Sequence, residues 1–288
     1  MKSKSLLSSY IELTKPSILN LVLVTTTLGF YLGGRGIHSW SLLIYLLIGA
    51  AMVCAGSGVL NHYVERDIDC KMLRTKNRPI PLGVISAPTA LNFGVLLILF
   101  GLIILYVKVN LLTAFLSLLT AFLYILVYTP MKRISWLNTT IGSIPGAIPP
   151  MGGWAAATGN LDWGAWIIFA ILFLWQHPHF YAIAWMYKED YKRGGFKMLP
   201  VIEPDGESTF KQILWHSSIL IPISLLPTLI GLSGYFYLSG ALLAGVLLFL
   251  VGFKLTQSKT VMDAQKLLKA TVVYLPILLL LIVIDVNF

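Results

Sequence analysis

Long apolar runs alternate with short polar segments along the whole chain. A helix needs about 20 mainly apolar residues to cross the hydrocarbon core of a bilayer. Nine stretches meet that requirement, at residues 17–34, 41–63, 88–107, 110–129, 137–157, 163–187, 213–233, 236–254 and 270–287. The runs are continuous, whereas the strands of a membrane β-barrel alternate apolar and polar positions. The pattern predicts an all-α, polytopic membrane bundle of about nine transmembrane helices, with residues 1–288 forming a single transmembrane domain.

The composition supports lipid as the main surroundings of the chain. Hydrophobic residues make up 57% of it and charged residues only 11%, against roughly 25% charged residues in soluble domains. The first 14 residues lack the apolar core and small-residue cleavage site of a signal peptide. We expect a multi-pass protein of a bacterial inner (plasma) membrane, in contact with the lipid bilayer and without a nucleic-acid partner.

The positive charges are distributed unequally between the two ends of the predicted spans. Of the 21 lysines and arginines, 19 lie in the N-terminal segment or in the segments after the second, fourth, sixth and eighth spans. Only Arg35 and Lys108 fall on the other side. Because basic segments stay on the cytoplasmic side of a membrane, we expect a cytoplasmic N-terminus. Nine spans then place the C-terminus outside.

A polar face closes the second span. Asn61, Glu65 and Asp69 are spaced four residues apart, so on a helix they stack on one face at steps of about 6 Å. An amide and two carboxylates in this arrangement can hold Mg²⁺, which bridges oxygen ligands to phosphate. The plain alternative is a helix end entering water, but ionisable groups inside a span are costly and point to function. The bases that can contact phosphate oxygens are Arg66, Arg74 and Arg78.

Two further clusters occur at the same predicted membrane face. One follows the sixth span and contains Asp190, Lys192 and Lys197. The other follows the fourth span and contains Tyr128, Lys132 and Arg133. Bases in these positions serve either phosphate binding or orientation in the membrane, and the sequence leaves both open.

Two features lie deeper in the predicted bilayer. The sixth span contains the segment Gln-His-Pro-His-Phe with His177 and His179, and intramembrane histidines mark functional sites. Either histidine can contact a buried substrate or bind a haem iron, unless it only bonds a neighbouring helix. The fifth span is rich in Gly and Pro between residues 142 and 153. Irregular backbone at this depth is tolerated where it lines a cavity, so we expect a central cavity.

These residues together resemble the UbiA-type intramembrane prenyltransferases, and among them the branch that farnesylates haem. The resemblance covers nearly the whole chain. Its motifs are the Asn61, Glu65 and Asp69 face and residues 13–16, 66–69, 74–79, 128–129, 132–133, 146–150, 153–154, 175–180, 190–191 and 198–200.

The resemblance implies both a reaction and roles for these residues. Farnesyl diphosphate and haem B would be the substrates, haem O and diphosphate the products, with Mg²⁺ as cofactor and a downstream haem A synthase as a possible partner. Asn61, Glu65, Asp69, Arg74 and Asp190 would be catalytic, and all of these except Arg74 would hold metal. The substrate-binding residues would be Arg66, Arg78, Tyr128, Lys132, Arg133, His177, His179, Lys192 and Lys197.

Two departures from the family pattern affect the predicted metal site. Glu65 stands where the family usually has Asp, which moves the carboxylate by about one bond length. In the second motif only Asp190 matches an acid, because Met186 replaces the first one. Lys192 and Lys197 would then neutralise more of the diphosphate charge.

Three other functions fit parts of the sequence. A related prenyltransferase acting on a quinone precursor would share the fold and the first motif. A membrane transporter would also need a cavity and buried polar groups, but its site would lie near the midplane and not at one face. A structural assembly subunit would explain the spans and leave the Asn61, Glu65 and Asp69 face unused.

Overall fold

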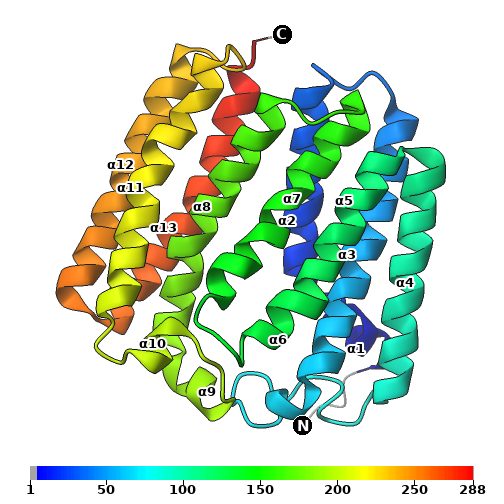
Figure 1. Cartoon of the computed structure of the whole chain (residues 1–288), viewed down its shortest axis with the longest axis vertical. Coiled ribbons are helices and arrows are strands. Elements are labelled where there is room, and N and C mark those ends of the chain that lie inside the picture. The colour runs from blue at the N-terminus through cyan, green and yellow to red at the C-terminus, as the bar shows by residue number, and fades with distance from the viewer. Residues whose placement is uncertain (1–4, 288) are drawn as a thin grey trace.

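The computed structural model describes residues 5–287 and confirms a helical bundle (Figure 1). Within these residues nine long helical segments run side by side. They are α2 (Pro16–Gly33), α3 (Trp40–Asp69), α4 (Ala87–Lys108), the composite segment Leu111–Met131, α7 (Asn138–Thr158), α8 (Trp163–Met186), α11 (Glu207–Leu229), α12 (Tyr235–Ser258) and α13 (Val261–Ile284). The composite segment consists of α5 (Leu111–Phe122), a π-helical stretch (Leu123–Tyr128) and α6 (Thr129–Met131).

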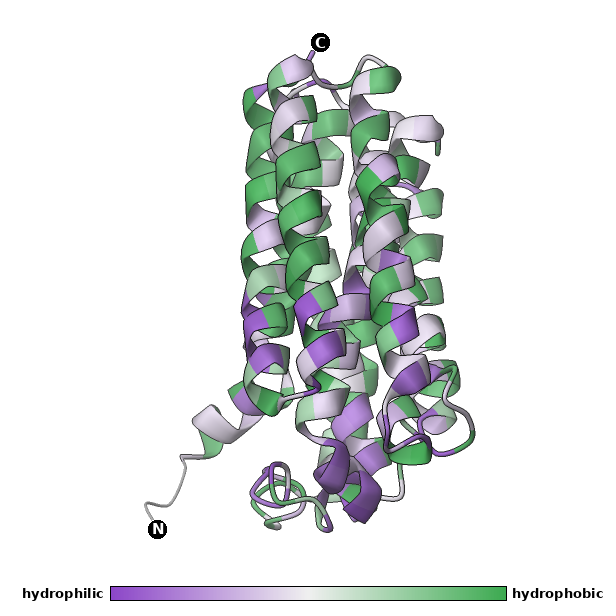
Figure 2. Cartoon of the chain, turned by 90° about the vertical axis from the view of Figure 1, so that its left-hand side faces the viewer, coloured by the Kyte–Doolittle hydropathy of each residue, from purple (hydrophilic) through white to green (hydrophobic). Residues whose placement is uncertain are grey.

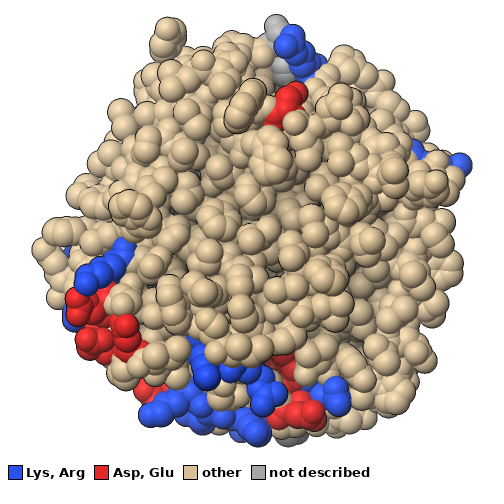
Figure 3. Space-filling view, viewed as in Figure 1, with Lys and Arg blue, Asp and Glu red and all other residues tan. Residues whose placement is uncertain are grey.

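Three short helices lie at one end of the bundle, α1 (Leu6–Leu13), α9 (Lys188–Arg193) and α10 (Leu199–Ile202). The N-terminal helix and the loop after α3 are at this end, and the C-terminus is at the opposite one (Figure 1). Hydrophilic residues concentrate at the same end (Figure 2). Most of the visible charged side chains gather there as well (Figure 3). The fold therefore reproduces the charge asymmetry of the sequence; we call this end the charged end.

Several helices extend beyond the apolar stretches that predicted them. α3 continues to Asp69, six residues past the expected end, and α11 and α13 begin at Glu207 and Val261, six and nine residues early. The extra turns carry polar side chains, among them Lys211 and Lys266, which lower local hydropathy without opposing helix formation. Hydropathy thus located the apolar length of these helices and missed their polar turns. Lys2 and Lys4 lie outside the described residues.

α7 is the one long segment that is not apolar enough to be identified as a span by composition alone. It packs between α2, α5 and α8, so little of its surface needs to match lipid. The backbones of α7 and α2 approach each other closely. A Cβ on Gly153 would collide with the Thr26 carbonyl, and one on Gly29 would collide with the Pro150 carbonyl. Small residues permit such approach between membrane helices. The expected irregular backbone is absent from this segment, which stays helical through its three prolines.

Candidate active site

The face of α3 formed by Asn61, Glu65 and Asp69 turns into the bundle. The exposed fractions of the three residues are 0%, 5% and 0%. Each meets a cationic side chain from another part of the chain, so none is an isolated buried charge. Burying ionised groups is costly unless they are paired and hydrogen-bonded. The α3 face is therefore a built polar site, and not a helix end that simply enters water.

The cation at Glu65 is Lys132, from the turn after α6. Its Nζ lies 2.7 Å from Glu65 Oε1 and 4.6 Å from the centre of the Tyr128 ring. Burial alone would lower the pKa of Lys132, but the Glu65 carboxylate outweighs it and holds the pKa above its usual value. Lys132 is thus the ion-pair partner of Glu65.

The cation at Asp69 is Arg78, from the loop after α3. Arg78 Nη1 donates to both carboxylate oxygens, at 2.8 and 2.7 Å. Thr75 Oγ1 donates to the Asp69 backbone carbonyl at 3.2 Å. These bonds fold the loop back against the end of α3 and fix Arg78 in front of Asp69.

The cation at Asn61 is Lys15, immediately before α2. Its Nζ donates to Asn61 Oδ1 and, at 3.0 Å, to the hydroxyl of Tyr124. The Asn61 amide nitrogen donates to Thr129 Oγ1 at 3.0 Å, which fixes the amide with its oxygen toward Lys15. Burial lowers the pKa of Lys15 to about 7, and the nearby Lys132 and Arg78 charges act in the same direction while Glu65 opposes them.

The π-helical stretch explains how the composite segment supplies this site. Pro130 has no N–H for a regular helical bond, and Thr129 Oγ1 donates to the Tyr124 carbonyl at 2.7 Å. π-Helical turns inside α-helices are uncommon and recur at functional sites. Here the stretch places Tyr124 against Lys15 and Tyr128 against Lys132. The sequence predicted only a continuous apolar span at residues 110–129.

Asp190, in α9, has a different set of partners. Its Oδ1 accepts from the Leu73 backbone N–H at 2.8 Å and from Arg193 at 2.8 Å, and its Oδ2 accepts from the Arg74 N–H at 3.2 Å. Burial would raise the pKa of Asp190, but Arg193 and the two amides hold it below its usual value. Asp190 thus anchors the loop after α3 to α9, and the structure does not bring it to the α3 face.

A polar cavity of about 400 Å³ opens in front of the α3 face, and we call it the mouth cavity. Asn61 and Glu65 line it, while Asp69 lies behind Arg78. Arg74 reaches it from the anchored loop, stacked over Tyr191 at 5.8 Å and Tyr187 at 5.3 Å. The polar lining residues are Glu12, Lys15, Ser17, Asn61, His62, Glu65, Arg74, Thr75, Arg78, Tyr128, Lys132 and Tyr191.

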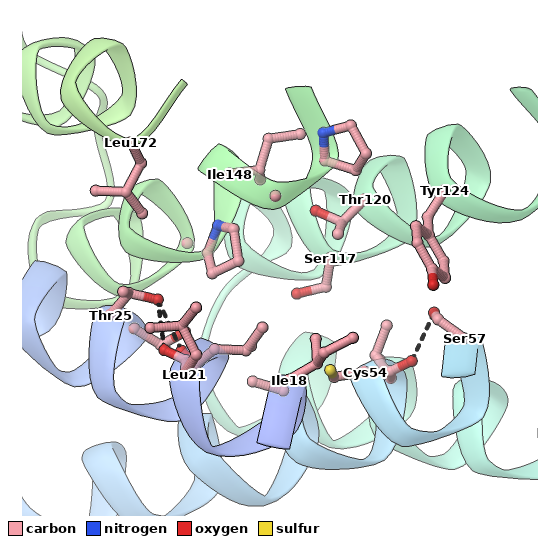
Figure 4. A pocket seen from close by; sticks show the side chains of 18 of the residues that line it. Ile18, Leu21, Thr25, Cys54, Ser57, Ser117, Thr120, Tyr124, Ile148 and Leu172 are labelled. Atoms are coloured by element: carbon pink, nitrogen blue, oxygen red, sulfur yellow. Dashed lines mark hydrogen bonds between the residues drawn. The ribbon is translucent and has the colours of Figure 1, made fainter. Parts of the chain in front are cut away.

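A second, mainly apolar cavity of about 310 Å³ lies deeper in the bundle, and we call it the inner cavity. Its walls come from α2, α3, α5, the π-helical stretch, α7 and α8, and the labelled side chains of several of these helices surround it (Figure 4). Lys15, Ile18 and Tyr128 belong to both linings, so the two cavities adjoin. The hydroxyls of Thr25 and Ser57 donate to carbonyls of their own helices. The expected central cavity is present, with a charged mouth and an apolar interior.

Several predicted substrate-binding residues do not line either cavity. Arg66 stacks on Tyr63 at 4.7 Å, and Arg133, Lys192 and Lys197 are exposed. Lys197 contributes through its backbone, because its N–H donates to the Lys132 carbonyl at 2.7 Å. Of the two histidines in α8, His179 lines the inner cavity and His177 does not.

Sequence reasoning also missed residues of the mouth. Lys15 was interpreted as part of the charge asymmetry, although it precedes Pro16 at a helix start and adopts a left-handed backbone with φ of 53°. His62 follows Asn61 and is 2% exposed, and its Nδ1 has no hydrogen-bond partner among the described residues. The sequence offered one signal for each residue. Lys15 directly precedes Pro16 at a helix start, and His62 lies inside an acidic motif.

The donors of the α3 face suit Mg²⁺. All are oxygens, and Mg²⁺ is usually held by one or two carboxylates together with substrate phosphates. Among the described residues no three acidic, histidine or cysteine side chains cluster as a metal cage. The face is therefore suited to a metal shared with a phosphate ligand. Lys15, Lys132 and Arg78, which satisfy the oxygens here, are free to pair with phosphate instead.

The chain is similar to known proteins in sequence and in fold. The model of the UbiA prenyltransferase family matches residues 22–275. A protoheme IX farnesyltransferase of Solibacter usitatus is 45% identical, covering 96% of this chain and 98% of that protein. One of Salinibacter ruber is 41% identical, covering 97% and 99%.

Two solved structures share the fold at low sequence identity. A digeranylgeranylglyceryl phosphate synthase has a TM-score of 0.82 at 18% identity, covering 97% of this chain and 98% of that one. A UbiA homolog from Archaeoglobus fulgidus bound to GPP and Mg²⁺ has a TM-score of 0.68 at 17% identity, covering 96% and 100%. With the family match and the full-length relatives, this chain is a multi-pass membrane protein that belongs to the UbiA prenyltransferase family.

Proposed function

We propose that this chain transfers the farnesyl group of farnesyl diphosphate to a vinyl group of haem B. The C1–O bond of farnesyl diphosphate breaks and diphosphate leaves with the bonding electrons. A haem vinyl carbon then forms a bond to C1, water adds to the other vinyl carbon, and one proton is released. The products are haem O and diphosphate. The supporting observation is the buried α3 face with its cations, set directly above an apolar cavity.

The mouth cavity is the proposed diphosphate site. Lys15, Arg74, Arg78 and Lys132 face it with only Glu12 and Glu65 as acids in the lining. Cationic groups already in position stabilise the charge that grows on the leaving diphosphate. Mg²⁺ held by Asn61, Glu65 and Asp69 would add Lewis-acid stabilisation of that charge. Asp190 serves this site by holding the loop that carries Arg74.

The inner cavity is the proposed site of the farnesyl chain and of carbon–carbon bond formation. A farnesyl cation reacts with any water it meets, so excluding water before the vinyl carbon attacks protects the product. The cavity wall is mainly apolar, and the Thr25 and Ser57 hydroxyls are engaged with backbone carbonyls. Of the two histidines of α8, only His179 lines this cavity, so it is the candidate contact for haem.

The names of the full-length relatives support haem as the acceptor, because the curated relatives at 37–45% identity are protoheme IX farnesyltransferases. We further propose that the charged end faces the cytoplasm of a bacterial cell, with the N-terminus inside. Haem O would pass to an enzyme that oxidises it, such as a haem A synthase.

Membranes containing this chain should convert haem B, farnesyl diphosphate and Mg²⁺ into haem O, identified by its mass. A parallel reaction with 4-hydroxybenzoate as acceptor tests the quinone-precursor alternative. Haem O formation, absent from membranes without the chain, supports the proposal. Prenylation of 4-hydroxybenzoate alone would contradict it, and transport of a polar solute without diphosphate release would favour the transporter.

A further inference from the structure

The two histidines of α8 are held by different hydrogen bonds. They are two residues apart, so on a helix they point in clearly different directions. His177 is fully buried, and His179 is half-buried beside the inner cavity. The hydrogen-bond partners of each ring show which nitrogen remains available to a substrate.

His177 has both ring nitrogens occupied. Nδ1 lies 2.8 Å from the Phe173 carbonyl, and Nε2 lies 3.3 Å from Thr140 Oγ1. A carbonyl only accepts, so Nδ1 carries the proton and Nε2 accepts from the Thr140 hydroxyl. The ring also stacks on His216 with centres 3.7 Å apart and planes 6° apart. His177 is therefore a packing residue.

His179 has one nitrogen fixed and the other available. Nδ1 lies 2.9 Å from Thr271 Oγ1, and that hydroxyl donates its single proton to the Leu268 carbonyl at 2.6 Å. Thr271 must then accept from the Nδ1–H of His179. The neutral ring consequently keeps a lone pair on Nε2, which has no hydrogen-bond partner among the described residues.

Trp175 contacts both members of the His179–Thr271 pair. Its ring stacks on the His179 ring with centres 5.1 Å apart and planes 27° apart, and its Nε1 donates to the Thr271 backbone carbonyl at 2.8 Å. Trp175 and Thr271 are both buried. The orientation and the tautomer of His179 are thus set by neighbours on α8 and α13 before any substrate binds.

The position of His179 favours contact with a bound substrate over a purely structural role. It lines the inner cavity with Gln176 and Phe180, seven residues before the end of α8, or about 10 Å from it along the helix. A neutral imidazole whose Nδ1–H is bonded to an oxygen is how proteins usually prepare an Nε2 metal ligand. A fixed lone pair on a residue that lines an apolar cavity is suited to the iron of a haem.

We infer that Nε2 of His179 binds the iron of haem B in the inner cavity and that Thr271 is the positioning residue that presents it. This rests on the proposed haem substrate. Partners that orient a metal-binding histidine typically change metal affinity 10- to 100-fold when removed. Thr271 therefore contributes to haem affinity without contacting haem iron.

The experiment is a haem B titration of the purified full-length protein in detergent, followed by visible absorption of the ferric and ferrous forms. Wild type and His177→Ala should show the bands of an imidazole-bound haem. His179→Ala should lose them and regain them with added imidazole. Thr271→Val should weaken haem binding about 10-fold or more, and Thr271→Ser, which keeps the acceptor, should not.

The outcomes separate this inference from the proposed function. If wild type makes haem O and His179→Ala keeps the wild-type haem spectrum and affinity, the inference is wrong and the function stands. The inference is equally wrong if His177→Ala alone loses the imidazole bands, or if Thr271→Val and Thr271→Ser bind haem equally well. If wild type neither binds haem nor makes haem O, both proposals fail. Thermal unfolding of each variant in detergent, measured without haem, checks that the variant is folded.

Discussion

Two acidic regions lie at the charged end of this molecule and differ in what their carboxylates do. Glu65 and Asp69 of α3 point into the bundle and meet side-chain cations from outside α3, at 2.7 Å for Lys132 and for Arg78. Asp190 of α9 accepts two backbone N–H groups of the loop after α3 and pairs with Arg193, three residues away. The first region lies at a cavity, and the second holds the loop that borders the cavity.

The difference suggests two roles for these carboxylates. Those of Glu65 and Asp69 are placed for chemistry at the cavity, and that of Asp190 is placed to hold a loop in position. Side-chain cations can exchange a carboxylate for phosphate or make room for a metal ion, because a side chain can change rotamer without unfolding the backbone that carries it. Backbone amides cannot leave Asp190 without unfolding the loop that carries Arg74. We therefore expect the α3 face to change partners when diphosphate binds, and Asp190 to keep its own.

The largest expected effect comes from removing a carboxylate of the α3 face. Asp69→Ala and Glu65→Ala should each reduce haem O formation by about 100- to 1,000-fold, the loss typical of removing one preorganised stabilising group. Turnover by membranes with matched protein amounts measures this. His177→Ala, which alters neither cavity wall, is the control. Near wild-type turnover in both alanine variants would remove the α3 face from the mechanism.

Lys132→Ala should destabilise the folded protein, because it leaves Glu65 buried without its cation. Breaking a buried ion pair from one side typically costs about 3 kcal/mol or more. Thermal unfolding in detergent should show the loss. Adding Glu65→Gln to Lys132→Ala should restore much of it, since a neutral amide is cheaper to bury. If the double variant is less stable than Lys132→Ala, the pair is not the source of the effect.

Asp190→Asn should act through Arg74. The amide can accept only one of the two loop N–H bonds, so Arg74 loses its fixed position and the KM for farnesyl diphosphate should rise about 10-fold, which corresponds to roughly 1.4 kcal/mol. In the Arg74→Ala background the same change should have little further effect, as expected for residues that act through one another. Fully additive effects would mean that Asp190 acts elsewhere.

The smallest expected effects are at the exposed bases. Lys192→Ala and Lys197→Ala remove side chains that line neither cavity. Kinetics with farnesyl diphosphate should change by less than about threefold, since exposed charges are screened by salt and solvent. A tenfold rise in KM for either variant would show that the segment carrying that lysine moves toward the mouth cavity when substrate binds.

The sequence was enough to predict the helical bundle, the charged end and the α3 face, because each follows from local periodicity. Asn61, Glu65 and Asp69 share a helix face at a spacing of four residues whatever the tertiary structure. The two loop partners of Asp190 could not be predicted, since Leu73 and Arg74 meet it through backbone atoms that carry no sequence signal. Nor could the different roles of His177 and His179, which depend on Thr140 and Thr271 in other helices.

Lys15 illustrates a third limit. A lysine near the end of a membrane span can serve either as an orientation signal or as part of a functional site. Only the contact of Lys15 with Asn61 separates these two interpretations. The lengths of α11 and α13 were missed because hydropathy detects only the apolar part of a helix. Both helices begin earlier, in turns made of polar residues.

The most direct test of the central claim is the Mg²⁺ dependence of haem O formation in three proteins, wild type, Asp69→Asn and Asp190→Asn, at saturating farnesyl diphosphate. If the α3 face holds the metal, Asp69→Asn should need at least about 10-fold more Mg²⁺ for half-maximal rate, as loss of a metal ligand or its close support does. Asp190→Asn should follow the wild-type curve. An unchanged Mg²⁺ requirement in Asp69→Asn, or an equal shift in Asp190→Asn, would contradict the division of the two acidic regions into a metal site and a loop anchor.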